Sequence, residues 1–358
     1  MDSGETNPNS INFYIGYILV LTILYASIML IQNFLKNRNE EIDKNVTMDY
    51  YGARGTQIIL DRLTPEQSKK RFQYLLVSVM VKAATWVKAP YLFALYNRVH
   101  GFTRSEIGYL MAVDNISSLI FGPILGGLSD IYGRKKFCII YCLGIIVHIS
   151  LRITGLKELA WFAQIFTGIC SCLLDSVFES WINFEAEYLF YNVSEEDRLK
   201  MKNSYLREIF TKQISLDCFC SIVLTGLATI LYAKYNIFYP FYACMIFAGI
   251  AAFTITVLWD ENQMSRLFEN KKGHEKQKKT FCEQIKSSWN ELKHNCPLLC
   301  VGGIESCFKV SLALFLFIWT PLLEETIGSF IHPGAIFACF MLARLIGSEA
   351  FEVIIKFK

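Results

Sequence analysis

Long apolar runs constrain this chain most, because about 20 apolar residues are enough for a helix to cross the hydrocarbon core of a bilayer. Hydrophobic residues make up 53% of the 358 residues and charged residues only 19%, whereas about a quarter of a soluble protein is charged. The sequence therefore predicts an all-α polytopic membrane protein. We expect spans at about 11–35, 72–97, 106–131, 136–156, 158–184, 207–233, 237–259, 297–322 and 334–356.

The first run, 11–35, is typical of a membrane anchor rather than of a cleaved signal peptide. The residues before it include Asp2 and Glu5 but no base, and the apolar stretch is longer than the core of a signal peptide. Lys36 and Arg38 follow it. Because basic residues favour the cytoplasmic side, we expect the N-terminus outside and the polar linker up to residue 71 inside.

The distribution of Lys and Arg supports the same orientation of the spans in the membrane. The segments expected in the cytoplasm hold 26 of the 35 Lys and Arg, and the segments expected outside hold only Arg98, Arg104, Lys157 and Lys234. The Lys-rich segment 260–296 then becomes a cytoplasmic linker. It is either a plain solvated linker or a polybasic surface for anionic lipid.

One motif lies between the second and third runs of the core, GGLSDIYGRKK from Gly126 to Lys136. Gly126 would allow close packing of a helix end, and Gly133 would allow a tight reversal. Asp130 lies within reach of Arg134, and Lys135 continues a basic cluster. The motif resembles the loop signature of the major facilitator superfamily, which implies a conformational latch. An ordinary helix-turn-helix with basic flanks is the alternative.

Three further stretches narrow the resemblance: Trp86–Tyr96, Phe178–Glu185 and Phe317–Leu322. In this order they are similar to the eukaryotic molybdate-anion transporters. The resemblance implies a major facilitator fold with an extra N-terminal transmembrane helix, and a multi-pass protein of the plasma membrane that takes up molybdate by secondary active transport. In that family the position of Lys88 usually holds Gln.

The resemblance also implies a division of the chain. Residues 1–71 would hold the anchor and a cytoplasmic linker, and residues 72–259 the N-terminal half of six helices. Residues 260–296 would be the basic linker, and residues 297–358 the first two helices of a second half. Relative to the full fold, this C-terminal half is expected to be truncated.

Ionisable residues near the middle of spans are expensive in a bilayer, so they normally face a bundle interior or a water-filled cavity. Such residues here are Lys82, Lys88, Asp114, Asp175, Glu179, Asp217, Glu305, Lys309 and Arg344. For Lys88, Lys309 and Arg344 one hypothesis is a cationic vestibule for a tetrahedral dianion, since Lys and Arg only donate hydrogen bonds. The alternative is that each base neutralises a structural acid.

The carboxylates allow two roles as well. Glu179 could couple a proton if burial raises its pKa, or it could be a buried helix contact. Asp175, Glu185 and Glu305 share the same pair of alternatives, proton coupling or a structural contact. Pro90 should kink the first core helix, because proline cannot donate to the carbonyl four residues earlier.

Several function classes lack their sequence signals. No catalytic motif or phosphate-binding loop is present, and the five His residues lack metal-ligand spacing, so we expect no enzyme, no metal and no cofactor. A net charge of +3 gives no indication of nucleic-acid binding. Two hypotheses remain. The first is a secondary transporter of a small anion or another small solute, for which proton coupling is the expected energy source and the sequence does not indicate an oligomeric state. The second is a non-transporting membrane scaffold or nutrient-sensing relative.

Overall fold

The computed structural model describes residues 64–191, 193–261, 286, 289–290, 293–327 and 333–356. The expected anchor at 11–35 and most of the expected linker at 260–296 lie outside these residues. Every regular element in the described part of the chain is helical, so the expected all-α fold is confirmed. Seven of the described helices are long and apolar enough to cross a membrane, and an eighth carries a shorter apolar stretch, Ile336–Gly347.

The helices extend beyond the apolar runs at several ends. Their bounds are α3 Pro65–Trp86, α5 Arg104–Tyr132, α6 Arg134–Ile153, α7 Lys157–Leu189, α8 Glu195–Lys234, α9 Tyr239–Leu258, α12 Cys296–Ile327 and α13 Pro333–Lys356. Between α3 and α5 the chain forms three short pieces, η1 Ala89–Tyr91, α4 Leu92–Ala94 and η2 Leu95–Val99. The lengths and compositions of these helices indicate that the protein is a multi-pass integral membrane protein.

Two helices begin at capping boxes that can be recognised in the sequence. Thr64 accepts from the backbone N–H of Gln67, whose side chain in turn accepts from the Thr64 N–H. Thr103 and Glu106 repeat the arrangement at the start of α5. Each box satisfies two backbone donors that have no partner within the helix.

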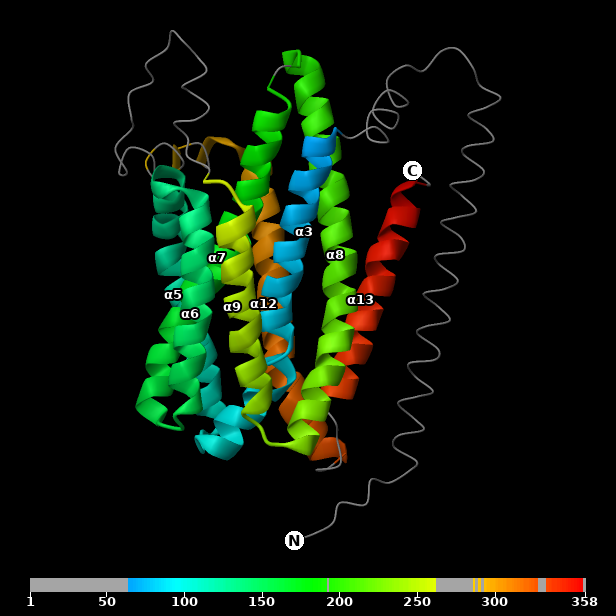
Figure 1. The fold of residues 1–358 in the computed structure, drawn as a ribbon. Helices are drawn as coiled ribbons and strands as arrows, with labels where there is room; N and C mark the ends of the chain where they lie inside the picture. The colour runs from blue at the N-terminus through cyan, green and yellow to red at the C-terminus, as the bar shows by residue number, and fades with distance from the viewer. Residues whose placement is uncertain are drawn as a thin grey trace. The chain divides into compact units, whose positions relative to one another are not determined.

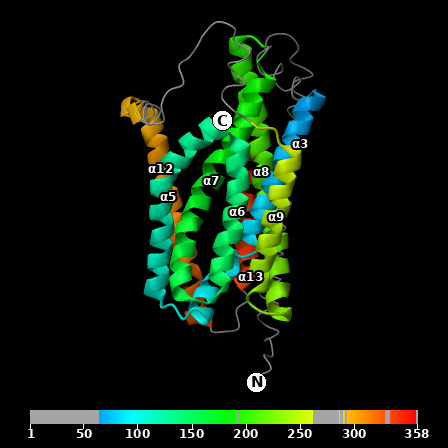
Figure 2. The same ribbon diagram turned by 60° about the vertical axis from the view of Figure 1, so that its left-hand side comes forward.

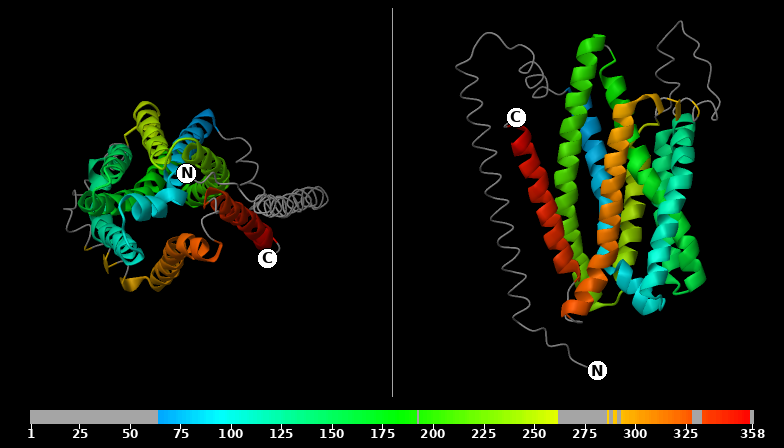
Figure 3. Two further views of the ribbon diagram at one scale, coloured as in Figure 1. Left: turned by 90° about the horizontal axis from the view of Figure 1, so that it is seen from below. Right: turned by 180° about the vertical axis from the view of Figure 1, so that it is seen from behind.

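The chain divides into two compact units. The first comprises residues up to 91, 182–251 and 332–358, and the second comprises residues 92–181 and 252–331. In the first unit, α8 packs against both α3 and α13, and the three helices lie side by side (Figure 1, Figure 3). Tyr74, Val77 and Val81 of α3 and Cys218 of α8 belong to the buried core there.

In the second unit, α7 packs closely on both α5 and α6 (Figure 2). A Cβ atom built at Gly168 of α7 would lie 2.4 Å from the backbone oxygen of Asp114 in α5. Gly144 of α6 faces Cys170 of α7 in the same way. Farther along, Trp181 of α7 stacks on Trp259, with ring centroids 3.8 Å apart.

Candidate functional site

Asp217 of α8 is the centre of a buried polar contact in the first unit. Its carboxylate is only 4% exposed and accepts from Arg344 Nη1 of α13 at 3.0 Å. The indole Nε1 of Trp86, the last residue of α3, donates to the other oxygen at 2.5 Å. Arg344 and Asp217 therefore form an ion pair in this structure.

Lys309 of α12 lies in a cluster with two carboxylates in the second unit. Its Nζ atom is 2.9 Å from Asp175 of α7 and 3.2 Å from Glu305, one turn earlier in α12. The charges of the three groups sum to one negative charge, and all three side chains are more than half exposed. An anion would meet repulsion here unless a carboxylate is protonated or moves away.

Lys88 and Pro90 lie where the first core helix becomes irregular. The α-helix ends at Trp86, four residues before Pro90, and the backbone oxygen of Lys88 accepts from the N–H of Tyr91 at 3.1 Å. The side chain of Tyr91 anchors this segment on α8, because its hydroxyl donates to Thr229 at 3.1 Å and its ring stacks on Tyr232. The segment after Lys88 is thus fixed in an interrupted helical path.

Glu185 and Glu179 have different surroundings although both lie on α7. Glu185 forms an ion pair of 3.0 Å with Lys70 of α3, and both side chains are nearly buried, at 7% and 11% exposure. Glu179, six residues earlier, is exposed. The partner Lys70 could not be found from the sequence, since the two residues are far apart along the chain.

The motif Gly126–Lys136 forms the end of α5 and the start of α6. Arg134 donates to Asp130 one turn earlier, and the arginine is buried. Gly133 adopts a φ of 106°, where a side chain would be strained, and a Cβ there would collide with Glu261. One expectation is wrong: α5 continues past Gly126, and a Cβ at Gly126 meets no described atom within 4 Å, so close packing does not explain this glycine.

Lys135 adds a contact that sequence reasoning missed. Its Nζ atom donates to the backbone oxygens of Thr256 at 2.9 Å and Trp259 at 2.7 Å, which lie at the C-terminal end of α9. Its backbone N–H donates to Glu261 at 3.2 Å. Because a helix C-terminus carries a partial negative charge and unpaired carbonyls, the lysine caps α9 and ties the motif to it.

Arg152 near the end of α6 is a second residue that was missed. It is 1% exposed and donates to Gln164 Oε1 and Thr167 Oγ1 of α7. The guanidinium also lies over the ring of Tyr96, 5.6 Å from its centroid. A buried arginine held by neutral acceptors on the next helix is a structural contact rather than an open site.

Comparison with known proteins decides the family. The model of a major facilitator family described as sugar transporters with 12 transmembrane segments matches residues 45–358. The chain belongs to this major facilitator family. The expected superfamily is thereby confirmed, and with it a transporter-type membrane fold.

Named relatives of this major facilitator chain are molybdate-anion transporters. The protein from Takifugu rubripes is 26% identical over 323 residues, which cover 84% of this chain and 64% of the relative. The protein from Danio rerio is 23% identical over 301 residues, covering 79% and 60%, and that from Xenopus laevis is 22% identical over 274 residues, covering 76% and 55%. The chain thus spans less than two thirds of the length of these relatives.

Proposed function

We propose that this protein is a secondary active transporter of a small anion, most simply one that takes up molybdate across the plasma membrane. The observation that carries the proposal is the similarity to named molybdate-anion transporters over 76–84% of the chain. Lys88, Lys309 and Arg344 are proposed as donors to the anion. Lys309 and Arg344 would first have to release the carboxylates that they contact.

The proposed coupling ion is a proton, and Glu179 is the proposed carrier. Its place in a membrane-spanning helix supports this role, because an ionisable residue in a span normally faces the bundle interior or a water-filled cavity and marks an ion or proton path. Under this proposal, uptake rises as the outside becomes more acidic, and Glu179→Gln removes that dependence. An unchanged pH profile in Glu179→Gln would assign the coupling elsewhere.

The test is uptake of radiolabelled molybdate by cells that express the full-length protein, with sulfate and a hexose as competitors. The proposal expects uptake above that of cells without the protein, inhibition by sulfate and none by the hexose. The description of the family as sugar transporters supports a second candidate, another small solute such as a sugar. Hexose uptake without molybdate uptake would favour that candidate, and normal membrane abundance with neither would favour a scaffold or sensor.

A further inference from the structure

The proposed role of Arg344 raises a question about Asp217. If Arg344 releases this carboxylate to donate to the anion, a negative charge remains on a side chain that is only 4% exposed. Asp217 also lies in a helix that is long and apolar enough to cross the membrane. A buried charge that loses its counter-ion is strongly destabilising. Release of Arg344 is therefore costly unless another group neutralises Asp217.

Trp86 of α3 is one group that can stay with Asp217. Its indole Nε1 donates to Oδ1 at 2.5 Å, whereas Arg344 donates to Oδ2 at 3.0 Å. The indole is a neutral donor, so it orients the carboxylate but does not cancel its charge. Once Arg344 has left, Oδ2 needs a donor and the carboxylate needs a cation.

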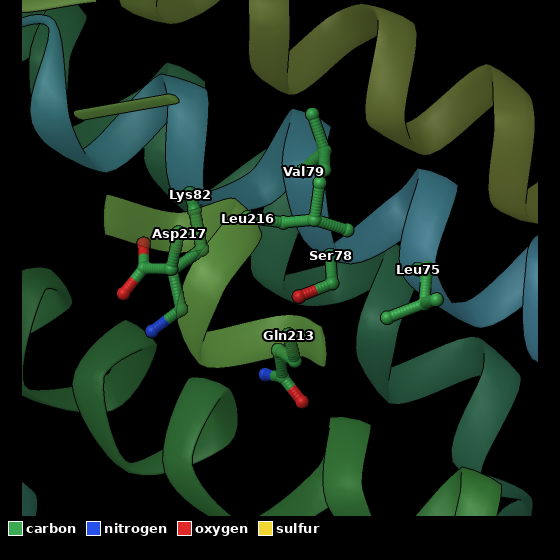
Figure 4. Close-up of a pocket in the computed structure, with 7 residues that line it drawn as sticks. All are labelled: Leu75, Ser78, Val79, Lys82, Gln213, Leu216 and Asp217. Atoms are coloured by element: carbon green, nitrogen blue, oxygen red, sulfur yellow. The ribbon is translucent and has the colours of Figure 1, made fainter. Parts of the chain in front are cut away.

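Lys82 is the cation that the fold places beside Asp217. It lies one turn before Trp86, so the two residues share the face of α3 that meets Asp217. Lys82 and Asp217 line the same cleft between α3 and α8 (Figure 4). Lys82 makes no ion pair and no side-chain hydrogen bond with any residue that the structure describes. It can therefore turn to Asp217 without breaking a described contact.

The cleft is too narrow for a ligand. Its remaining lining residues come from one face of each helix, Leu75, Ser78 and Val79 of α3, and Gln213 and Leu216 of α8. The space between them does not admit a water molecule, so water from this side cannot stabilise the charge on Asp217. A lysine can, because its ammonium is a compact charge on a flexible stem of four carbons.

The charges of the three groups favour an exchange of counter-ions. Lys82, Asp217 and Arg344 sum to one positive charge, which lies on Lys82 while Arg344 contacts Asp217. When Lys82 contacts Asp217 instead, the unpaired positive charge lies on Arg344, where an anion can accept from it. Asp217 is neutralised in both arrangements. The buried carboxylate then does not oppose the release of Arg344.

We propose that Lys82 is a positioning residue, which replaces Arg344 as the counter-ion of Asp217 when Arg344 turns to the anion. The inference rests on the proposed function and deepens it, because Lys82 acts through Arg344 and does not touch the anion itself. The exchange also changes which helices are joined. The ion pair of Asp217 joins α8 to α13 before the anion binds and α8 to α3 afterwards.

The experiment is equilibrium binding of radiolabelled molybdate to the purified full-length protein, to the Lys82→Gln and Asp217→Asn variants and to the double variant. Lys82→Gln should lower the affinity roughly tenfold, because Asp217 then holds Arg344 more firmly. Asp217→Asn should restore most of this loss in the double variant, since an amide needs no counter-ion. The gain from Asp217→Asn should thus be roughly tenfold larger in the Lys82→Gln background than in the parent.

Lys69→Gln is the matched control, because Lys69 is an exposed lysine at the start of the same helix. It should bind as the parent does, and Asp217→Asn should have the same effect with and without it. Equal gains from Asp217→Asn in the parent and in Lys82→Gln would overturn the exchange, because Lys82 would then act on the anion directly or not at all.

A measurement on the parent protein serves if a variant does not fold. A hydrophobic carbodiimide activates a buried carboxylate, and a lysine that contacts it then forms an amide, whereas a paired arginine does not. Molybdate should therefore increase the cross-link between Asp217 and Lys82, measured by mass spectrometry. No increase at saturating molybdate would overturn the role of Lys82 and leave anion transport intact. A parent protein that binds neither molybdate nor sulfate would instead overturn the proposed function, and this inference with it.

Discussion

The basic residues in the spans differ in whether a described carboxylate forms an ion pair with them. Arg344 contacts Asp217 and Lys309 contacts Asp175 and Glu305, whereas Lys82 contacts no carboxylate among the described residues. Sequence reasoning identified all of these residues as costly in a bilayer. It could not predict which of them form ion pairs. Asp217 and Arg344, for example, are 127 residues apart, and helical periodicity shows which residues share a face but not which helix lies opposite.

Lys88→Gln tests Lys88 as a donor to the anion. If Lys88 donates to the dianion, the variant should lose roughly ten- to a hundredfold in apparent affinity for molybdate at unchanged membrane abundance. The measurement is concentration-dependent uptake together with surface labelling. Uptake equal to or better than that of the parent would remove Lys88 from the site, since Gln is what the resembling family usually has there.

Lys70 and Glu185 form the least exposed ion pair described in the first unit. Lys70→Met should destabilise the protein by about 3–5 kcal/mol, because it leaves a buried carboxylate without its partner. Lys70→Met combined with Glu185→Leu should recover most of that loss, since two apolar groups can replace a buried pair. Thermal unfolding in detergent measures both variants, and a double variant less stable than Lys70→Met would contradict the prediction.

Whole helices were easier to predict than their ends. The apolar run at 207–233 predicts a span, but α8 begins at Glu195, twelve residues earlier. Ion pairs stabilise its polar first part, and a hydropathy profile does not detect them. They are Lys212 with Glu208 in the same helix, Arg71 of α3 with Glu208, and Lys202 with Glu187 of α7. At about 1.5 Å per residue, its 40 residues extend to about 60 Å, whereas a bilayer core is about 30 Å thick.

The motif between α5 and α6 is predicted to set the balance between two transport conformations. Asp130→Asn weakens the contact that holds Arg134, so it should change the maximal rate of uptake several-fold with little effect on apparent affinity. Glu158→Gln is the matched control, because Glu158 is exposed at the start of α7 and makes no ion pair in the described part of the chain. An altered affinity with an unchanged maximal rate would place this motif in contact with substrate.

For the whole molecule, the apolar runs predict where the chain crosses the membrane, and the Lys and Arg residues predict which side each loop faces. We predict that an epitope tag within 260–296 is labelled only after cells are permeabilised, whereas a tag at the N-terminus is labelled on intact cells. Both tags are measured in one cell line by flow cytometry. Labelling of the linker tag on intact cells would contradict the orientation of every span.

The contacts of Arg152 have a consequence for how the chain enters a membrane. A buried arginine makes α6 a poor candidate for insertion by itself, yet both of its acceptors, Gln164 and Thr167, come only 12 and 15 residues later. Synthesis of the first turns of α7 therefore supplies what α6 lacks, and the two helices should partition from the translocon as a hairpin. In a glycosylation-mapping assay, α6 alone should insert less well than α6 with α7, and Gln164→Leu should remove part of the difference.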